Sequence, residues 1–309
     1  MDKTKSVNRL FLATVICVFG VSWIIQRFGI NLPYYPSMVL GEAAIAFPAL
    51  LYLLIKRIPA GEWIPHRKLD GRTVGKLLLL TVLLLPLMTF LNALSMLFST
   101  NYVAQDTTFL QDNSIWLNLL VIAVIPAVFE EFCFRGVLYG GWRENGPLAA
   151  AVVCGITFGL MHRNLNQFFY AAVLGFVFSV IVEATGSVFA SMAVHFFING
   201  WSVLLIALMG PLSEYLDSAL GSGYAQQLQQ EAVTAQSLLD TLNLYGPLAV
   251  ICTALAGCVM VWIARGLGRQ PELRGCFTKK GQRFWSVWMP SLCLACGFCI
   301  GYMVMLEVF

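Results

Sequence analysis

The side chains most able to do chemistry form a charged cluster inside an apolar stretch of the sequence. Glu130, Glu131 and Arg135 fall within one short segment, EEFCFR. An ionisable side chain in hydrocarbon costs at least about 3 kcal/mol, so these three should be paired and should face a protein interior. On a helix, Glu131 and Arg135 share a face because they are four residues apart. We therefore predict an ion pair between them, while Glu130, turned about 100° around the axis, is available for proton transfer.

Two further apolar segments supply polar side chains that could meet this cluster. His162 ends one of them, and His195 and Asn199, four residues apart, lie in another. The third histidine of the chain, His66, lies in a basic polar loop. Counting 1.5 Å per residue from the expected span ends places Glu130, His162, His195 and Asn199 near mid-membrane. The sequence therefore predicts that these four side chains line one polar cavity.

A glutamate, two histidines and an asparagine around one cavity are typical of a hydrolytic site. The carboxylate can accept a proton from water and later return it to a leaving group, and the amide and an imidazole can stabilise an oxyanion. The alternative is zinc held by Glu130, His162 and His195, with water in the fourth position. The chain contains no H-E-x-x-H helix, the usual zinc-binding pattern. We therefore favour metal-free glutamate catalysis without a cofactor.

The composition indicates that transmembrane helices position these side chains. Hydrophobic residues make up 59% of the chain and charged residues only 11%, against roughly 25% charged in soluble domains. Each span needs about 20 apolar residues, which predicts an all-α, polytopic transmembrane helical bundle of about nine spans and a single membrane domain, 1–309. The expected spans are residues 10–30, 36–55, 75–98, 115–140, 147–163, 166–184, 187–209, 243–264 and 285–305.

The orientation follows from the basic residues. With the amino terminus cytoplasmic and the carboxyl terminus outside, most of the 19 Lys and Arg residues fall in inside segments, including a basic cytoplasmic loop at 265–284. The net charge of +3 then reflects the orientation in the membrane. The sequence shows no basic stripe interleaved with aromatic residues, the pattern that would predict nucleic-acid binding. The outer loop at 210–242 carries a glutamine-rich segment that predicts a short amphipathic helix.

Three motifs on successive spans resemble one family. They are E-E-x-x-x-R at 130–135, F-x-x-x-H at 158–162 and H-x-x-x-N at 195–199. This ordered set resembles the CAAX protease and bacteriocin-processing family of intramembrane endopeptidases, and the resemblance covers roughly residues 115–205, which would form the catalytic core. It implies that Glu130 and His162 activate water and that His195 and Asn199 form the oxyanion site. The supporting residues would be Glu131 and Arg135.

The leading hypothesis is an intramembrane endopeptidase that hydrolyses a peptide bond in a membrane-associated or lipid-modified protein or peptide. Its partners would be that substrate and the lipid bilayer, with no nucleic acid, and its location a bacterial cytoplasmic membrane. One alternative is a non-catalytic immunity or binding protein on the same scaffold. Another is a proton-coupled transporter, although the sequence shows no internal repeat of the kind that marks many transporters.

Overall fold

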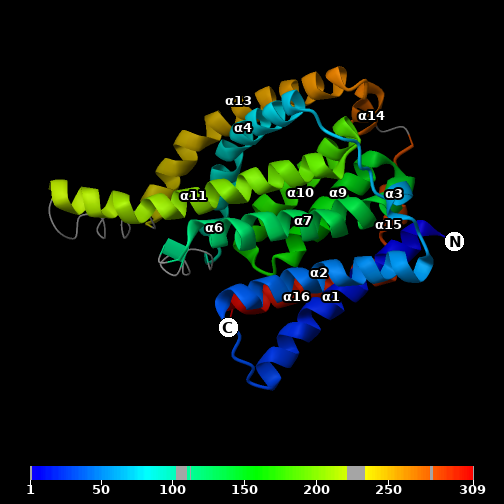
Figure 1. Ribbon diagram of the computed structural model, residues 1–309, viewed down its shortest axis with the longest axis horizontal. Helices are drawn as coiled ribbons and strands as arrows, with labels where there is room; N and C mark the ends of the chain where they lie inside the picture. Colours follow the sequence, from blue (N-terminus) through cyan, green and yellow to red (C-terminus); the bar gives the residue numbers. More distant parts are fainter. Residues whose placement is uncertain (1, 102–109, 112, 221–233, 279–280, 309) are drawn as a thin grey trace.

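The protein is an all-helical bundle (Figure 1). The computed structural model describes residues 2–101, 110–111, 113–220, 234–278 and 281–308. Within these residues, 8 helices are long and apolar enough to cross a membrane, and α9 (Pro147–Met161) is a shorter apolar helix. The predicted polytopic bundle of about nine spans is therefore confirmed.

Two outer groups of helices enclose a central one (Figure 1). The first group contains α1 (Lys3–Arg27), α2 (Tyr34–Lys56) and α16 (Pro290–Val308), and α1 packs against both of the others. The second is the pair α4 (Gly71–Met96) and α13 (Ala235–Gly266), which pack against each other. Each outer group shares a buried apolar core with the central helices, so the centre of the bundle is shielded from lipid on two sides.

The central group carries all three motifs. Its first member is an almost continuous helix with two π-helical segments, η2 and η3, on either side of the short α-helical segment that holds both glutamates. Such π-helical segments are frequent at functional sites. The segments of this first member are α6 (Ile115–Asn118), η2 (Leu119–Val124), α7 (Ile125–Glu131), η3 (Phe132–Leu138), α8 (Tyr139–Trp142) and the 3₁₀ turn η4 (Arg143–Asn145). The other members are α9, α10 (Leu165–Thr185) and α11 (Val188–Leu220).

The short helices gather at one end of the bundle. In Figure 1, α3 (Ala60–Trp63), α14 (Gln270–Gly275) and α15 (Phe284–Val287) lie near the amino terminus, and the carboxyl terminus lies at the other end. Termini at opposite ends agree with an odd number of crossings. The basic segments predicted to be cytoplasmic are thus brought together at the end that holds the amino terminus, and the side of the membrane that this end faces stays a prediction.

Helices extend beyond the predicted spans. α11 continues to Leu220 and α13 begins at Ala235, so both run into the predicted outer loop, 210–242. The amphipathic helix predicted in that loop lies partly outside the described residues. The predicted basic loop, 265–284, likewise contains the short helix α14. Hydropathy marks where the hydrocarbon ends, whereas a helix can continue into water because its backbone hydrogen bonds are internal.

Glycines bring α9 and α10 into direct backbone contact. A Cβ atom added at Gly155 would lie 2.6 Å from the carbonyl oxygen of Ala172, and one added at Gly175 would lie 2.9 Å from the Cα of Gly155. Real side chains do not tolerate such distances, so only glycine permits this approach. Small residues at helix interfaces allow close packing in membranes. The contact positions the Gly175 carbonyl, which the central charged cluster uses.

Candidate active site

The predicted ion pair between Glu131 and Arg135 is present and fully buried. Arg135 Nη1 donates to Glu131 Oε1 at 2.9 Å, and both side chains have 0% exposure. Arg135 Nη2 donates to the Gly175 carbonyl on α10 at 3.1 Å. A buried charge pair needs further hydrogen bonds to offset its lost hydration. The Gly175 carbonyl supplies one of them, which fixes the first central helix against α10.

His195 of α11 lies between the two glutamates. Its Nδ1 is 3.0 Å from Glu131 Oε1, and its Nε2 is 3.6 Å from Glu130 Oε2. Glu131 is already paired with Arg135 through the same oxygen, so it is an ionised acceptor for the imidazole N–H. We call Glu130, Glu131, Arg135 and His195 the central cluster. It contains two carboxylates and one guanidinium, and its second carboxylate, Glu130, is the less firmly held.

Aromatic rings form the walls around this cluster. The Arg135 guanidinium lies 4.3 Å from the ring centroid of Phe158 and 5.0 Å from that of Phe178. The His195 ring stacks on Phe178 at 5.3 Å and meets Phe158 edge-on at 6.0 Å. A guanidinium over an aromatic face is stabilised by the ring quadrupole, the more so where water is excluded. The rings therefore hold the cation and the imidazole in place.

His162 contacts the same phenylalanine, Phe158. Its ring lies 5.1 Å from the Phe158 ring, and its Nδ1 is 3.0 Å from the Phe158 carbonyl oxygen. A carbonyl oxygen only accepts, so Nδ1 carries the hydrogen and Nε2 of the neutral ring presents a lone pair. Within the described part of the chain, no hydrogen bond or ion pair joins His162 to Glu130.

Asn199 contacts the first central helix at its π-helical segment η2. Its amide nitrogen donates to the Ile122 carbonyl at 3.0 Å. This bond occupies one of its two amide hydrogens, and the second remains available to another acceptor. The structure therefore joins His195 directly to Glu130 and Glu131. It places His162 against Phe158, which His195 also contacts, and it ties Asn199 to the helix that carries both glutamates.

Comparison with known proteins finds a similar family over the central helices. Residues 112–201 match the family of Rce1-like type II CAAX prenyl endopeptidases. The resemblance predicted from the three motifs is confirmed over this segment, which contains every residue of the central cluster as well as His162 and Asn199.

A curated relative is similar over much the same length of chain. It is a Bacillus subtilis (strain 168) protein named "Putative membrane peptidase YdiL", and the two are 22% identical over 102 residues. The aligned segment covers 33% of this chain and 41% of the relative. No solved structure matches the chain significantly. The family match therefore concerns residues 112–201, which include most of the central helices.

Sequence reasoning on the CAAX-type motifs missed three positions that shape the site. Gly175 accepts from Arg135, and Phe178 stacks on His195, yet neither belongs to a motif. Glu42 lies on α2, which packs against α7, and its Oε2 is buried without a hydrogen bond from the described residues. A glutamate inside an apolar span was the available signal for Glu42, and nothing in the sequence pointed to the other two.

The donor groups do not form a clear metal site. Among the residues that the structure describes, no group of three or more His, Cys, Asp or Glu side chains is arranged to hold a metal ion. In the central cluster, Glu131 and His195 face each other rather than a common point. Zinc held by Glu130, His162 and His195 would require these side chains to turn, and the choice between zinc and metal-free chemistry stays a prediction.

A further buried glutamate, Glu183, lies towards the end of the bundle that holds the amino terminus. Glu183 accepts a hydrogen bond from Tyr139 Oη at 3.0 Å and one from Arg143 Nη2 at 2.9 Å, and Arg269 Nη2 lies 4.0 Å from its Oε2. We call Tyr139, Arg143, Glu183 and Arg269 the terminal cluster. A polar cavity of about 470 Å³ lies against all four residues and also reaches Arg135, so it connects the surroundings of the two clusters.

Proposed function

We propose that the protein is a membrane endopeptidase that hydrolyses a peptide bond in a membrane-associated or lipid-modified protein or peptide. The observation that carries this proposal is the central cluster, in which Glu131 and Arg135 hold His195 beside Glu130 inside an apolar bundle. The match to type II CAAX prenyl endopeptidases over residues 112–201 supports the same class of reaction.

Glu130 is the proposed proton acceptor. Glu131 has both a guanidinium and an imidazole as partners, whereas the contact of Glu130 with His195 is longer, at 3.6 Å. A carboxylate without a dedicated donor, in a site of low polarity, is suited to take a proton from water. The water oxygen then attacks the carbonyl carbon of the scissile bond, and Glu130 returns the proton to the departing amine nitrogen.

The hydrogen-bond partners of the two histidines support different roles. His162 donates its Nδ1–H to the Phe158 carbonyl. Its Nε2 lone pair can therefore accept a hydrogen bond from the attacking water. His195 has Glu131 beside its Nδ1 and Glu130 beside its Nε2. In the doubly protonated ring, Nε2–H and the second amide hydrogen of Asn199 would stabilise the oxyanion. Water or substrate would link His162 to Glu130.

The decisive experiment offers a library of membrane-associated and lipid-modified peptides to the purified full-length protein in lipid vesicles, with new peptide ends detected by mass spectrometry. Wild type is compared with Glu130→Gln and His162→Ala, each with and without a strong chelator. Glu183→Gln is the matched control, because it alters a buried glutamate outside the central cluster. Folding of every variant is checked by size-exclusion chromatography and circular dichroism.

We expect cleavage by wild type and Glu183→Gln, no cleavage by the other two variants, and no effect of the chelator. Loss of cleavage on chelation would instead indicate that Glu130 and the two histidines bind zinc. Cleavage that persists in folded Glu130→Gln would contradict its role as proton acceptor. If wild type cleaves no peptide, and Glu130→Gln and His162→Ala both retain the biological activity of the wild-type protein, the scaffold acts as a binding or immunity protein.

A further inference from the structure

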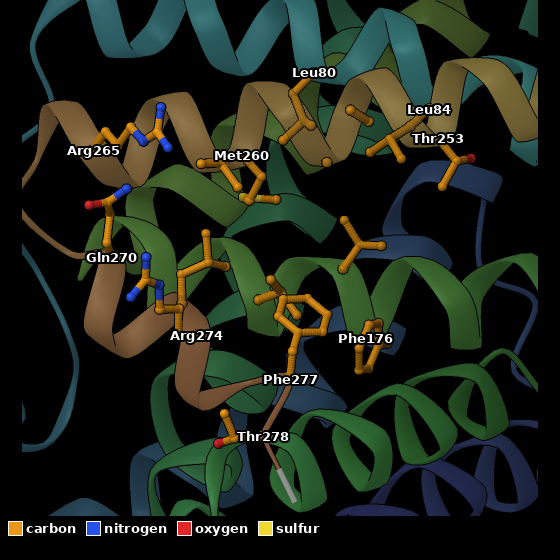
Figure 2. Close-up of a pocket in the computed structure, with 16 residues that line it drawn as sticks. Leu80, Leu84, Phe176, Thr253, Met260, Arg265, Gln270, Arg274, Phe277 and Thr278 are labelled. Atoms are coloured by element: carbon orange, nitrogen blue, oxygen red, sulfur yellow. The ribbon is translucent and has the colours of Figure 1, made fainter.

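A large apolar pocket lies apart from the central cluster, between α4, α10, α13 and α14. It has a volume of about 800 Å³, within the range of about 300–1,000 Å³ typical of small-molecule sites. Its walls are mostly aliphatic and aromatic, and neither the glutamates nor the histidines of the candidate active site line it. Figure 2 shows Leu84, Thr253 and Phe176 on one side of the pocket. A ligand with a long apolar portion fits such a lining.

The opposite side of the pocket is polar and basic. Arg265, Gln270 and Arg274 lie together there (Figure 2). Both arginines are exposed, and within the described residues neither guanidinium forms an ion pair or a hydrogen bond. The nearest acidic side chain of α14, Glu272, pairs with Arg269 at 3.5 Å. Two uncompensated positive charges therefore remain at the mouth of an apolar pocket.

Neighbouring side chains indicate the depth of this mouth in the bilayer. The Lys76 ammonium lies 4.2 Å from the ring centroid of Trp262, which is 54% exposed. Trp beside a basic residue is typical of the headgroup level of a membrane, and Arg265 follows Trp262 by one helical turn. Thr253 lies about 18 Å from Arg265 along α13 at 1.5 Å per residue. Half of a hydrocarbon core of about 30 Å is similar in length, so the pocket spans roughly one leaflet.

We propose that this pocket binds an anionic phospholipid of the leaflet at the amino-terminal end of the bundle. The headgroup phosphate is held by Arg265 and Arg274, with Gln270 as a further hydrogen-bond donor, and an acyl chain lies along α13 past Met260 to Thr253. A single phosphate provides the negative charge that the two arginines lack, and the chain covers apolar walls. Basic pockets between membrane helices bind anionic headgroups by this combination. The proposal does not depend on the proposed peptidase activity.

The test is a lipid titration of the delipidated full-length protein in mild detergent, followed by native mass spectrometry. The probes are phosphatidylglycerol, phosphatidylcholine with the same acyl chains, and glycerol phosphate, which has the charged group without chains. The charge variant is Arg265→Ala with Arg274→Ala. Its matched control is Lys5→Ala with Arg9→Ala, which removes two exposed charges at the same end of the bundle from α1, outside the pocket.

A second pair of variants tests the apolar part of the pocket. A side chain at Gly257 points into open space beside the pocket wall, with no atom within 4 Å of an added Cβ. Gly257→Phe should therefore fill the pocket without disturbing the fold. Gly297→Phe is the matched control, because Gly297 on α16 is equally unobstructed and lies outside the pocket. Size-exclusion chromatography and circular dichroism confirm that each variant is folded.

Phosphatidylglycerol should bind wild type and both controls alike, and much more tightly than phosphatidylcholine or glycerol phosphate. The double arginine variant should bind it about 10- to 30-fold more weakly, since each basic residue near an anionic surface contributes a factor of about five. Gly257→Phe should lose binding to a similar extent. Equal binding by the arginine variant and its control, or by the two glycine variants, would overturn the proposal. So would tight binding of a lipid-modified peptide that phosphatidylglycerol does not displace, because the pocket would then belong to a substrate.

Discussion

The two clusters both pair buried carboxylates with guanidiniums, but in opposite proportions. The terminal cluster surrounds one carboxylate, Glu183, with two guanidiniums and a phenol. The central cluster offers two carboxylates to one guanidinium and one imidazole. An excess of donors leaves Glu183 saturated and static, which is the arrangement of a structural anchor. An excess of acceptors leaves Glu130 without a dedicated donor, which is the arrangement expected of a group that exchanges protons.

The largest expected effect is on the cleavage rate, and it should differ between variants of Glu130 and of Glu183. Glu130→Gln should lower the cleavage rate by about 10²–10⁴-fold, the usual contribution of a positioned general base. Its stability should change little, because the amide can still contact His195. Glu183→Gln should keep the cleavage rate within about threefold of the wild-type rate, because Glu183 is not the general base. The rates are measured on any peptide that wild type cleaves, and equal losses in the two variants would remove the distinction between the clusters.

The next effect is on stability and concerns the buried ion pair. Arg135→Met keeps an apolar side chain between Phe158 and Phe178 but leaves Glu131 without its cationic partner. Breaking a buried pair in this way costs about 3–5 kcal/mol. The measurement is the free energy of unfolding in detergent with an added chemical denaturant. Lys3→Met is the control, because its pair with Glu144 is half exposed and such pairs contribute at most about 1 kcal/mol. A cost for Arg135→Met as small as that of the control would show that the central pair is not structural.

A smaller loss is expected in the terminal cluster. Glu183→Gln keeps an acceptor for Tyr139 but removes the charge that Arg143 and Arg269 face. Hydrogen bonds to charged groups contribute about 1.5–3 kcal/mol, and the half-exposed Arg143 side chain can turn to water, so a loss near 2 kcal/mol is expected on that scale. The same unfolding measurement applies. A loss as large as that of Arg135→Met would mean that the terminal cluster is as tightly coupled to folding as the central one.

The sequence was sufficient for contacts within one helix and insufficient for contacts between helices. The pair of Glu131 and Arg135 follows from their spacing, because four residues return the chain to the same face. Counting residues along a span gives a depth, and His195 does contact Glu130, whereas one polar cavity lined by all four predicted site residues stays a prediction. The depth of a residue in the membrane does not determine how its helix is rotated about its own axis. The contact of His195 with Glu131 depends on how α11 is turned against α7, and periodicity could not supply that angle.

Other features lay beyond sequence reasoning for a similar reason. Gly175 holds Arg135 through its backbone carbonyl, and any residue type has one. Its importance arises from the close approach of α9 and α10, which the glycines permit only when the helices are already packed. The apolar pocket is likewise formed by elements distant in sequence, since α4 and α10 line it together with the consecutive helices α13 and α14. The helical class, the approximate number of spans and the pair of Glu131 and Arg135 were predictable because they depend on composition and local spacing.

The smallest expected effect tests whether the terminal cluster is saturated. Tyr139→Phe removes one hydrogen bond to Glu183 and leaves both arginines in place. A single hydrogen bond contributes about 0.5–1.5 kcal/mol, so the free energy of unfolding should fall by about 1 kcal/mol with no change in cleavage. Combining Tyr139→Phe with Glu183→Gln gives a double-mutant cycle. Since the two side chains are in direct contact, the combined loss should differ from the sum of the single losses by at least about 0.5 kcal/mol. Strict additivity would show that the phenol stabilises the fold independently of the carboxylate, and Glu183 would then be held by its arginines alone.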